Sequence, residues 1–83
     1  MSATDNEIHQ KCLHRFIDLA NTMKNEGIKV DLVSRGMMTA AALYATFAVA
    51  GNEGGLTESG VDKMAELFKR DLQDVQAAKQ ARN

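Results

Sequence analysis

Apolar residues recur every three or four positions through the first third of the chain, with charged residues between them. This stripe consists of Ile8, Cys12, Phe16, Ala20 and Met23. The spacing is typical of an amphipathic helix with one buried face. Thr4 and Glu7 form a capping-box pattern before the stripe, and Gly27 is suited to end the helix in a left-handed conformation. We expect a helix over residues 5–26.

The middle of the chain differs, because residues 31–50 are apolar on almost every side. Asp31 or Ser34 can cap a helix there by accepting hydrogen bonds from free backbone N–H groups. One broad helical face carries bulky side chains, namely Leu32, Val33, Met37, Leu43, Tyr44 and Phe47. The opposite, small face carries Met38, Ala41, Ala42, Ala45, Ala48 and Val49. We expect a helix over residues 31–50 whose bulky face forms the core of one chain.

Glycines at positions 51, 54 and 55 make it costly for this helix to continue, so they predict a turn. Thr57 is the expected cap of a third helix, and Leu56 before it can pack on Val61 as a hydrophobic staple. The apolar stripe of that helix consists of Val61, Met64, Ala65, Phe68, Leu72 and Val75. We expect the third helix over residues 58–80.

These elements predict an all-α, three-helix bundle-like domain that occupies residues 1–83 as a single unit. Two one-sided helices can cover one broad face of the middle helix, which leaves an apolar patch that soluble monomers seldom expose. We therefore expect a homodimer or a complex with another protein. The expected interface consists of Met38, Ala41, Ala42, Ala45, Ala48 and Val49. The alternative is that the outer helices splay around the middle one and bury both of its faces.

Composition argues against several other partners. Ten Lys and Arg against eleven Asp and Glu give a net charge of −1, which disfavours nucleic acid. The uncharged stretch from Gly36 to Asn52 contains six alanines and is shorter than the roughly 20 strongly apolar residues that span a bilayer. We expect no membrane association. Residues 1–7 are polar and acidic, unlike a secretory signal, and one cysteine suits a reducing compartment, so we expect a cytoplasmic protein.

The order and spacing of residues in the first two predicted helices resemble a known protein family. The matching positions are Phe16-Ile17-Asp18-Leu19-Ala20-Asn21, Val33-Ser34, Met37-Met38, Ala41-Ala42, Tyr44 and Phe47. The sequence is similar there to a family of small, uncharacterised bacterial proteins with an Ala-rich central helix that carries a tyrosine and a phenylalanine. The resemblance implies a helical fold, covers about half of the chain, and assigns no activity.

Few residues offer chemistry. His9 and Cys12 are three positions apart on one helix and could direct two ligands toward a metal ion, but Cys12 also lies on the apolar stripe as a small hydrophobe. Ser34 lies at a helix start, where a cap is the commoner role than a nucleophile. Tyr44 belongs either to the core or to a small apolar pocket. No motif indicates catalysis, and we expect no cofactor.

The leading hypothesis is therefore a non-enzymatic helical interaction module whose wider role is unknown. Two alternatives stay open at this point. One is a small metal-dependent protein or enzyme that uses His9 and Cys12. The other is a nucleic-acid accessory protein.

Overall fold

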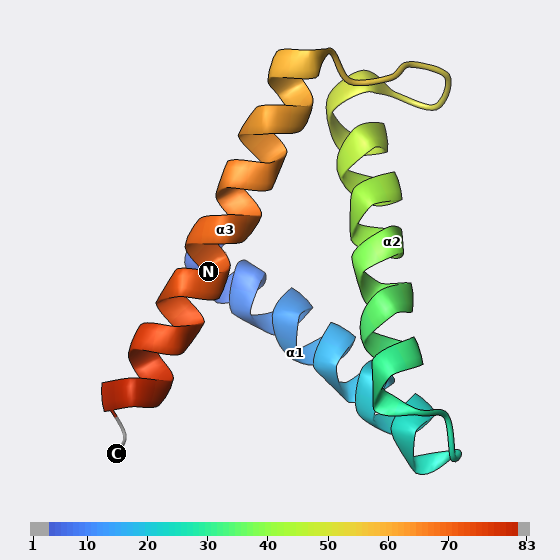
Figure 1. Ribbon diagram of the computed structural model, residues 1–83, viewed down its shortest axis with the longest axis vertical. Coiled ribbons are helices and arrows are strands. Elements are labelled where there is room, and N and C mark those ends of the chain that lie inside the picture. Colours follow the sequence, from blue (N-terminus) through green and yellow to red (C-terminus); the bar gives the residue numbers. More distant parts are fainter. Residues whose placement is uncertain (1–3, 82–83) are drawn as a thin grey trace. The chain divides into compact units, whose positions relative to one another are not determined.

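The computed structural model describes residues 4–81, and these residues contain three α-helices and no strand. The helices are α1 (Asp5–Asn25), α2 (Val30–Ala50) and α3 (Glu58–Ala81), joined by two connections (Figure 1). Each helix differs from its predicted range by one residue at one end. The predicted all-α fold with three helices is confirmed.

The chain divides into two compact units, Met1–Ala41 and Ala42–Asn83. The first unit contains α1 and the first half of α2, and the second contains the rest of α2 and α3. Because α2 runs through the boundary, each unit is one helix joined by a short connection to half of α2. The expectation of a single domain over 1–83 stays a prediction.

Thr4 begins α1 as predicted. The backbone N–H of Glu7 donates to the Thr4 hydroxyl oxygen at 3.1 Å, and the Thr4 hydroxyl donates to the Glu7 carboxylate at 3.1 Å. The cap satisfies one of the N–H groups that have no partner inside the helix. Asp5 and Glu7 add negative charge where the helix dipole favours it.

Gly27 ends α1 in the predicted left-handed conformation, with φ at 95°. The N–H of Ile28 donates to the carbonyl of Met23 at 3.2 Å, and the N–H of Gly27 donates to the carbonyl of Lys24 at 3.0 Å. This pair of bonds is the Schellman motif, which satisfies carbonyls that the helix itself leaves free. The local sequence therefore defines both ends of α1.

The predicted caps of α2 are wrong, because Asp31 and Ser34 both lie inside the helix. The N–H groups of Leu32 and Val33 donate to the carbonyl of Lys29, at 3.0 and 3.1 Å. Lys29 therefore holds the position before the first helical residue, although its side chain cannot accept a hydrogen bond. Asp31 instead stabilises the first turn through its charge, as acidic residues do at helix starts.

Thr57 caps α3 as predicted. Its hydroxyl oxygen accepts a hydrogen bond from the N–H of Gly60 at 3.1 Å, and its carbonyl accepts one from Val61 at 2.9 Å. Leu56 is half-buried, and its side chain lies close to Gly60 in the first turn, where an added Cβ would meet the Leu56 Cβ at 3.5 Å. Leu56 thus packs over the start of α3.

Very little of the chain is buried. Among residues 4–81, Val33 is the only buried side chain, at 9% exposed. Val33 follows the turn at Gly27 along the chain. Ala20 and Met23 of α1, which precede this turn, are half-buried. The contact between α1 and the start of α2 is therefore small, and it forms next to the turn that joins them.

We expect Gly27→Ala to lower the free energy of unfolding by about 1–2 kcal/mol, because a Cβ is disfavoured at positive φ. Gly36→Ala is the matched control, since Gly36 is helical and nothing lies within 4 Å of its added Cβ. That change should instead stabilise α2 by up to about 1 kcal/mol. Thermal unfolding followed by circular dichroism at equal chain concentration measures both variants. Equal effects of the two changes would contradict the role given to Gly27.

Candidate interaction surface

The small face of α2 is largely open to solvent. Met38 is 55% exposed and Val49 is 66% exposed. Ala41, Ala42 and Ala48 are exposed as well, whereas Ala45 is half-buried. The single helix α2 thus carries all six residues of the expected interface, on the same side of the helix. Their role as an interface stays a prediction.

The bulky face of α2 is also exposed, which corrects the expectation that it forms the core of one chain. Leu43 and Tyr44 are each 70% exposed, and Leu32, Met37 and Phe47 are exposed too. Val33 is the member of this face that is buried. Packing within the chain therefore protects the start of this face and leaves its later residues in water.

Tyr44 and Phe47 contact each other on the exposed bulky face. Their ring centroids are 5.6 Å apart, and the rings are tilted by 51°. Residues three apart on a helix are neighbours, so this aromatic pair is local to α2 and needs no second element. Tyr44 was expected in the core as a member of the bulky face. That expectation is wrong, because the Tyr44 side chain is mostly exposed.

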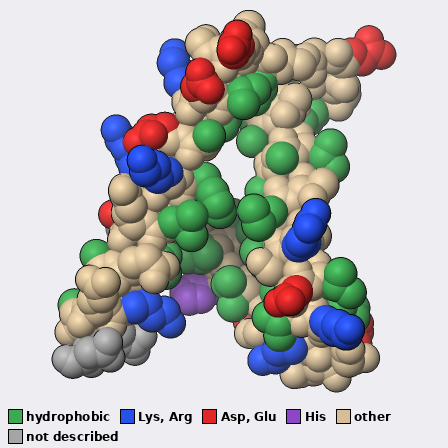
Figure 2. All heavy atoms as spheres, in the orientation of Figure 1, with side chains coloured by type: hydrophobic (Ala, Val, Ile, Leu, Met, Phe, Trp, Pro, Cys, Tyr) green, Lys and Arg blue, Asp and Glu red, His purple; other side chains and the backbone are tan. Residues whose placement is uncertain are grey.

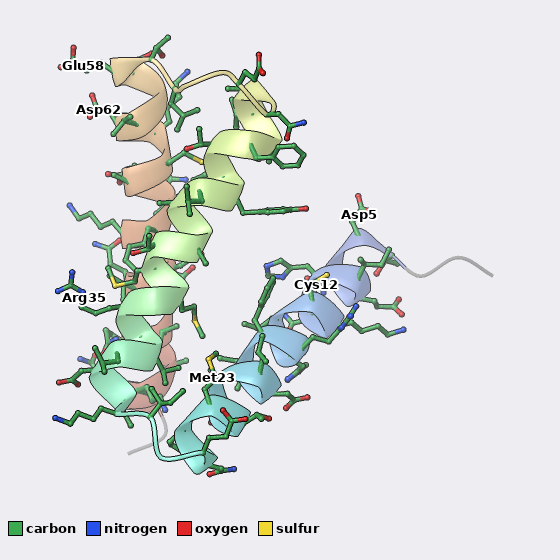
Figure 3. All side chains as sticks on the ribbon, turned by 90° about the vertical axis from the view of Figure 1, so that its right-hand side faces the viewer. Asp5, Cys12, Met23, Arg35, Glu58 and Asp62 are labelled. Carbon is green, nitrogen blue, oxygen red and sulfur yellow. The ribbon has the colours of Figure 1, made fainter. Side chains whose placement is uncertain are left out.

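The surface of α2 offers few polar groups to water. Its charged residues, Asp31 and Arg35, both lie near its start, and Figure 3 labels Arg35 there. The Thr46 hydroxyl donates to the carbonyl of Ala42 at 2.8 Å, so this hydroxyl is bonded within its own helix. By length and composition alone α2 could also cross a membrane, with a mean hydropathy of 1.3.

Most apolar side chains on α1 and α3 are exposed as well, although Ala20, Met23 and Met64 are half-buried, and hydrophobic side chains reach the surface of all three helices in Figure 2. Alternating spacings of three and four positions separate Leu13, Phe16, Ala20 and Met23 on α1, and Val61, Ala65, Phe68, Leu72 and Val75 on α3. This spacing is that of coiled-coil seams, which pack against another helix. The sequence predicted an apolar stripe on each helix, with Phe16, Ala20 and Met23 shared between the predicted α1 stripe and this seam, and it did not predict that most of these side chains are exposed.

The metal alternative gains no support from the geometry of α1. His9 and Cys12 lie on this helix, and Cys12 is a free, exposed thiol (Figure 3). Over residues 4–81, no three His, Cys, Asp or Glu side chains come together in a group that could hold a metal ion. Two ligands from one helix are fewer than the three or four protein ligands that zinc sites use.

Comparison with protein families gives one match. The model of the family described as "Protein of unknown function (DUF3144)" matches residues 9–78. The matched segment includes all of α2 and every position on which the sequence resemblance was based. No curated protein and no solved structure matches the chain.

We expect protein purified without an affinity tag to contain no stoichiometric zinc, because among residues 4–81 no third His, Cys, Asp or Glu forms a metal-binding group with His9 and Cys12. Cys12→Ser should leave the zinc content at background and change the unfolding free energy by less than about 0.5 kcal/mol, as for other exposed sites. Elemental analysis and thermal unfolding measure the two quantities. One equivalent of zinc that Cys12→Ser removes would instead establish a metal site.

Proposed function

The chain belongs to the DUF3144 family of proteins of unknown function, and we propose that it acts as a non-enzymatic helical interaction module. Its binding surface is the exposed apolar surface of α2, with Met38, Ala41, Ala42, Ala45, Ala48 and Val49 as the contact residues. The partner is a protein, either a second copy of the chain or a different protein with a helical, apolar surface.

The observation that carries this proposal is the exposure of the uncharged part of α2. From Gly36 to Ala50 the helix has no charged residue, and its large apolar side chains are exposed on both faces. Burial of apolar surface contributes a favourable free energy of about 25 cal/mol for each Å² removed from water. Soluble proteins that expose large apolar patches commonly use them for binding.

The small face suits a helical partner in particular. Ala41, Ala45 and Ala48 have short side chains, so the backbone of another helix can approach α2 closely. Met38 and Val49 lie towards the two ends of this face and are exposed. Methionine adapts its shape readily to the surface that it packs against.

Insertion into a membrane is the alternative to protein binding for an apolar helix of this length. The uncharged part of α2, from Gly36 to Ala50, extends about 22 Å at 1.5 Å per residue. The hydrocarbon core of a membrane is about 30 Å thick. A full span would therefore place Arg35, and beyond it Asp31, in or near the hydrocarbon, which is costly for charged groups. This mismatch favours a protein partner.

In-cell photo-crosslinking tests the proposal. A photoreactive phenylalanine analogue replaces Met38 in the full chain, and the cells are illuminated. We expect a discrete crosslinked protein adduct, identified by mass spectrometry, because this position lies at the proposed interface. The same analogue at Ala77 is the control, since Ala77 lies on α3 opposite its apolar stripe and is exposed.

The Ala77 variant should give at least about tenfold less adduct than the Met38 variant, as expected of a position outside a specific contact. Lipid adducts at Met38, or no adduct at all, would contradict a protein-binding role of α2. Equal labelling at both positions would also contradict it, because collisions rather than a bound complex would then explain the adducts.

A further inference from the structure

We propose that Met38 is a redox-sensitive modification site, and that its oxidation to methionine sulfoxide by a peroxide weakens the binding of the protein partner to α2. The inference rests on the proposed function and goes further, because it adds a regulatory step at the same surface. Methionine sulfoxide can be reduced back to methionine in cells, so the step can switch binding off and on again.

The first argument is exposure, because a peroxide has to reach the sulfur atom from solvent. Met38 is 55% exposed and Met37 is 38% exposed. Met23 and Met64 are half-buried. Met38 is therefore the most exposed methionine among residues 4–81, and a soluble oxidant should react with it fastest.

The second argument is the size of the neighbours of Met38 on α2. Residues three and four positions apart are neighbours on a helix surface. Towards the end of α2 these neighbours are Ala41 and Ala42, and towards its start they are Ser34 and Arg35. The first three have short side chains, and the charged end of Arg35 favours water. The neighbours on α2 therefore leave the thioether sulfur open to an oxidant.

The reaction transfers one oxygen atom to the Met38 sulfur. A lone pair of the thioether sulfur attacks one oxygen of hydrogen peroxide, the O–O bond breaks, and an S–O bond forms. The sulfur loses two electrons, and the second peroxide oxygen leaves as water with both hydrogens. A methionine sulfoxide reductase reverses the change, because two thiols are oxidised to a disulfide and the sulfoxide oxygen leaves as water.

The oxidised side chain is poorly suited to an apolar contact. A sulfoxide oxygen accepts hydrogen bonds, and water supplies them while Met38 is exposed. An apolar partner surface that covers Met38 removes this water. Few side chains between Gly36 and Ala50 can donate in its place, and the Thr46 hydroxyl already donates to the carbonyl of Ala42. An unpaired polar group of this kind weakens binding by about tenfold or more.

Met37 differs from Met38 in the face of the helix that it occupies. Successive residues are about 100° apart around a helix axis, so adjacent side chains point in different directions. Met38 belongs to the small face, which carries the proposed contact residues, whereas Met37 belongs to the bulky face. Oxidation of Met37 should therefore leave the contact intact, which makes Met37 the matched control.

An oxidation map of the purified chain tests the reactivity of Met38. The map uses the Cys12→Ser chain, because the free, exposed Cys12 thiol also reacts with peroxides. Mass spectrometry of peptides measures sulfoxide at each methionine after treatment with hydrogen peroxide. In the folded chain Met38 should be oxidised at least about threefold faster than Met23 or Met64, and in denaturant the three rates should become equal, because exposure then no longer differs.

Photo-crosslinking in cells tests the effect on binding. The photoreactive phenylalanine analogue replaces Val49, another contact residue, in the full Cys12→Ser chain. Hydrogen peroxide applied before illumination should lower the yield of the protein adduct about tenfold. Met38→Leu should keep the adduct under peroxide, because leucine is similar in size and has no sulfur. Met37→Leu should lose the adduct as the unsubstituted chain does.

A substitution that resembles the sulfoxide gives a second measurement without any oxidant. Met38→Gln places an uncharged polar group of similar length at the contact and should lower the adduct yield about tenfold. Met37→Gln is the matched control and should change the yield by less than about threefold, as at positions outside the contact. Circular dichroism of both purified variants should show the same helix content, so that a change in yield reports binding.

Three results would overturn the proposal. They are oxidation of Met38 no faster than that of Met23 and Met64, an adduct lost equally with Met38→Leu under peroxide, and equal effects of glutamine at positions 37 and 38. If the adduct forms and peroxide leaves it unchanged, the redox site is excluded and the interaction module stands. If no protein adduct forms even without peroxide, both proposals fail.

Discussion

Apolar side chains on α2 have to leave water, and one chain covers few of them. Burial of apolar surface is the main favourable contribution to folding, and it must offset the conformational entropy lost when the helices form. Val33 is buried, whereas Leu43 and Tyr44 on the same helix are mostly exposed. An apolar surface that packs on α2 would supply further burial. The proposed interaction surface follows from this constraint.

The helix ends do not depend on that missing burial, because hydrogen bonds between near neighbours define them. Thr4 and Thr57 accept bonds from the first turns of α1 and α3, and the Gly27 turn satisfies carbonyls at the end of α1. Such motifs involve residues within about five positions, so a sequence pattern predicts them well. The local structure can therefore be well defined even though little of the chain is buried.

The start of α2 was harder to predict. Asp31 and Ser34 are residue types that commonly cap helices, yet the helix begins before both of them, after Lys29. Propensity identifies residues that are able to cap a helix, and the path of the preceding turn selects the residue that holds the position. Here α2 begins at Val30, three residues after Gly27, and the Lys29 carbonyl accepts its first hydrogen bonds.

The sequence by itself determined the number and type of the elements, their ends within one residue, and the apolar character of both faces of α2. These properties depend on periodicity and on local hydrogen bonds. Only the tertiary structure decided that most of the bulky face of α2, including Leu43 and Tyr44, is exposed, together with most apolar side chains of α1 and α3. Periodicity identifies a face that has to be buried, but the surface that covers it depends on contacts between distant residues, and those contacts can lie in another molecule.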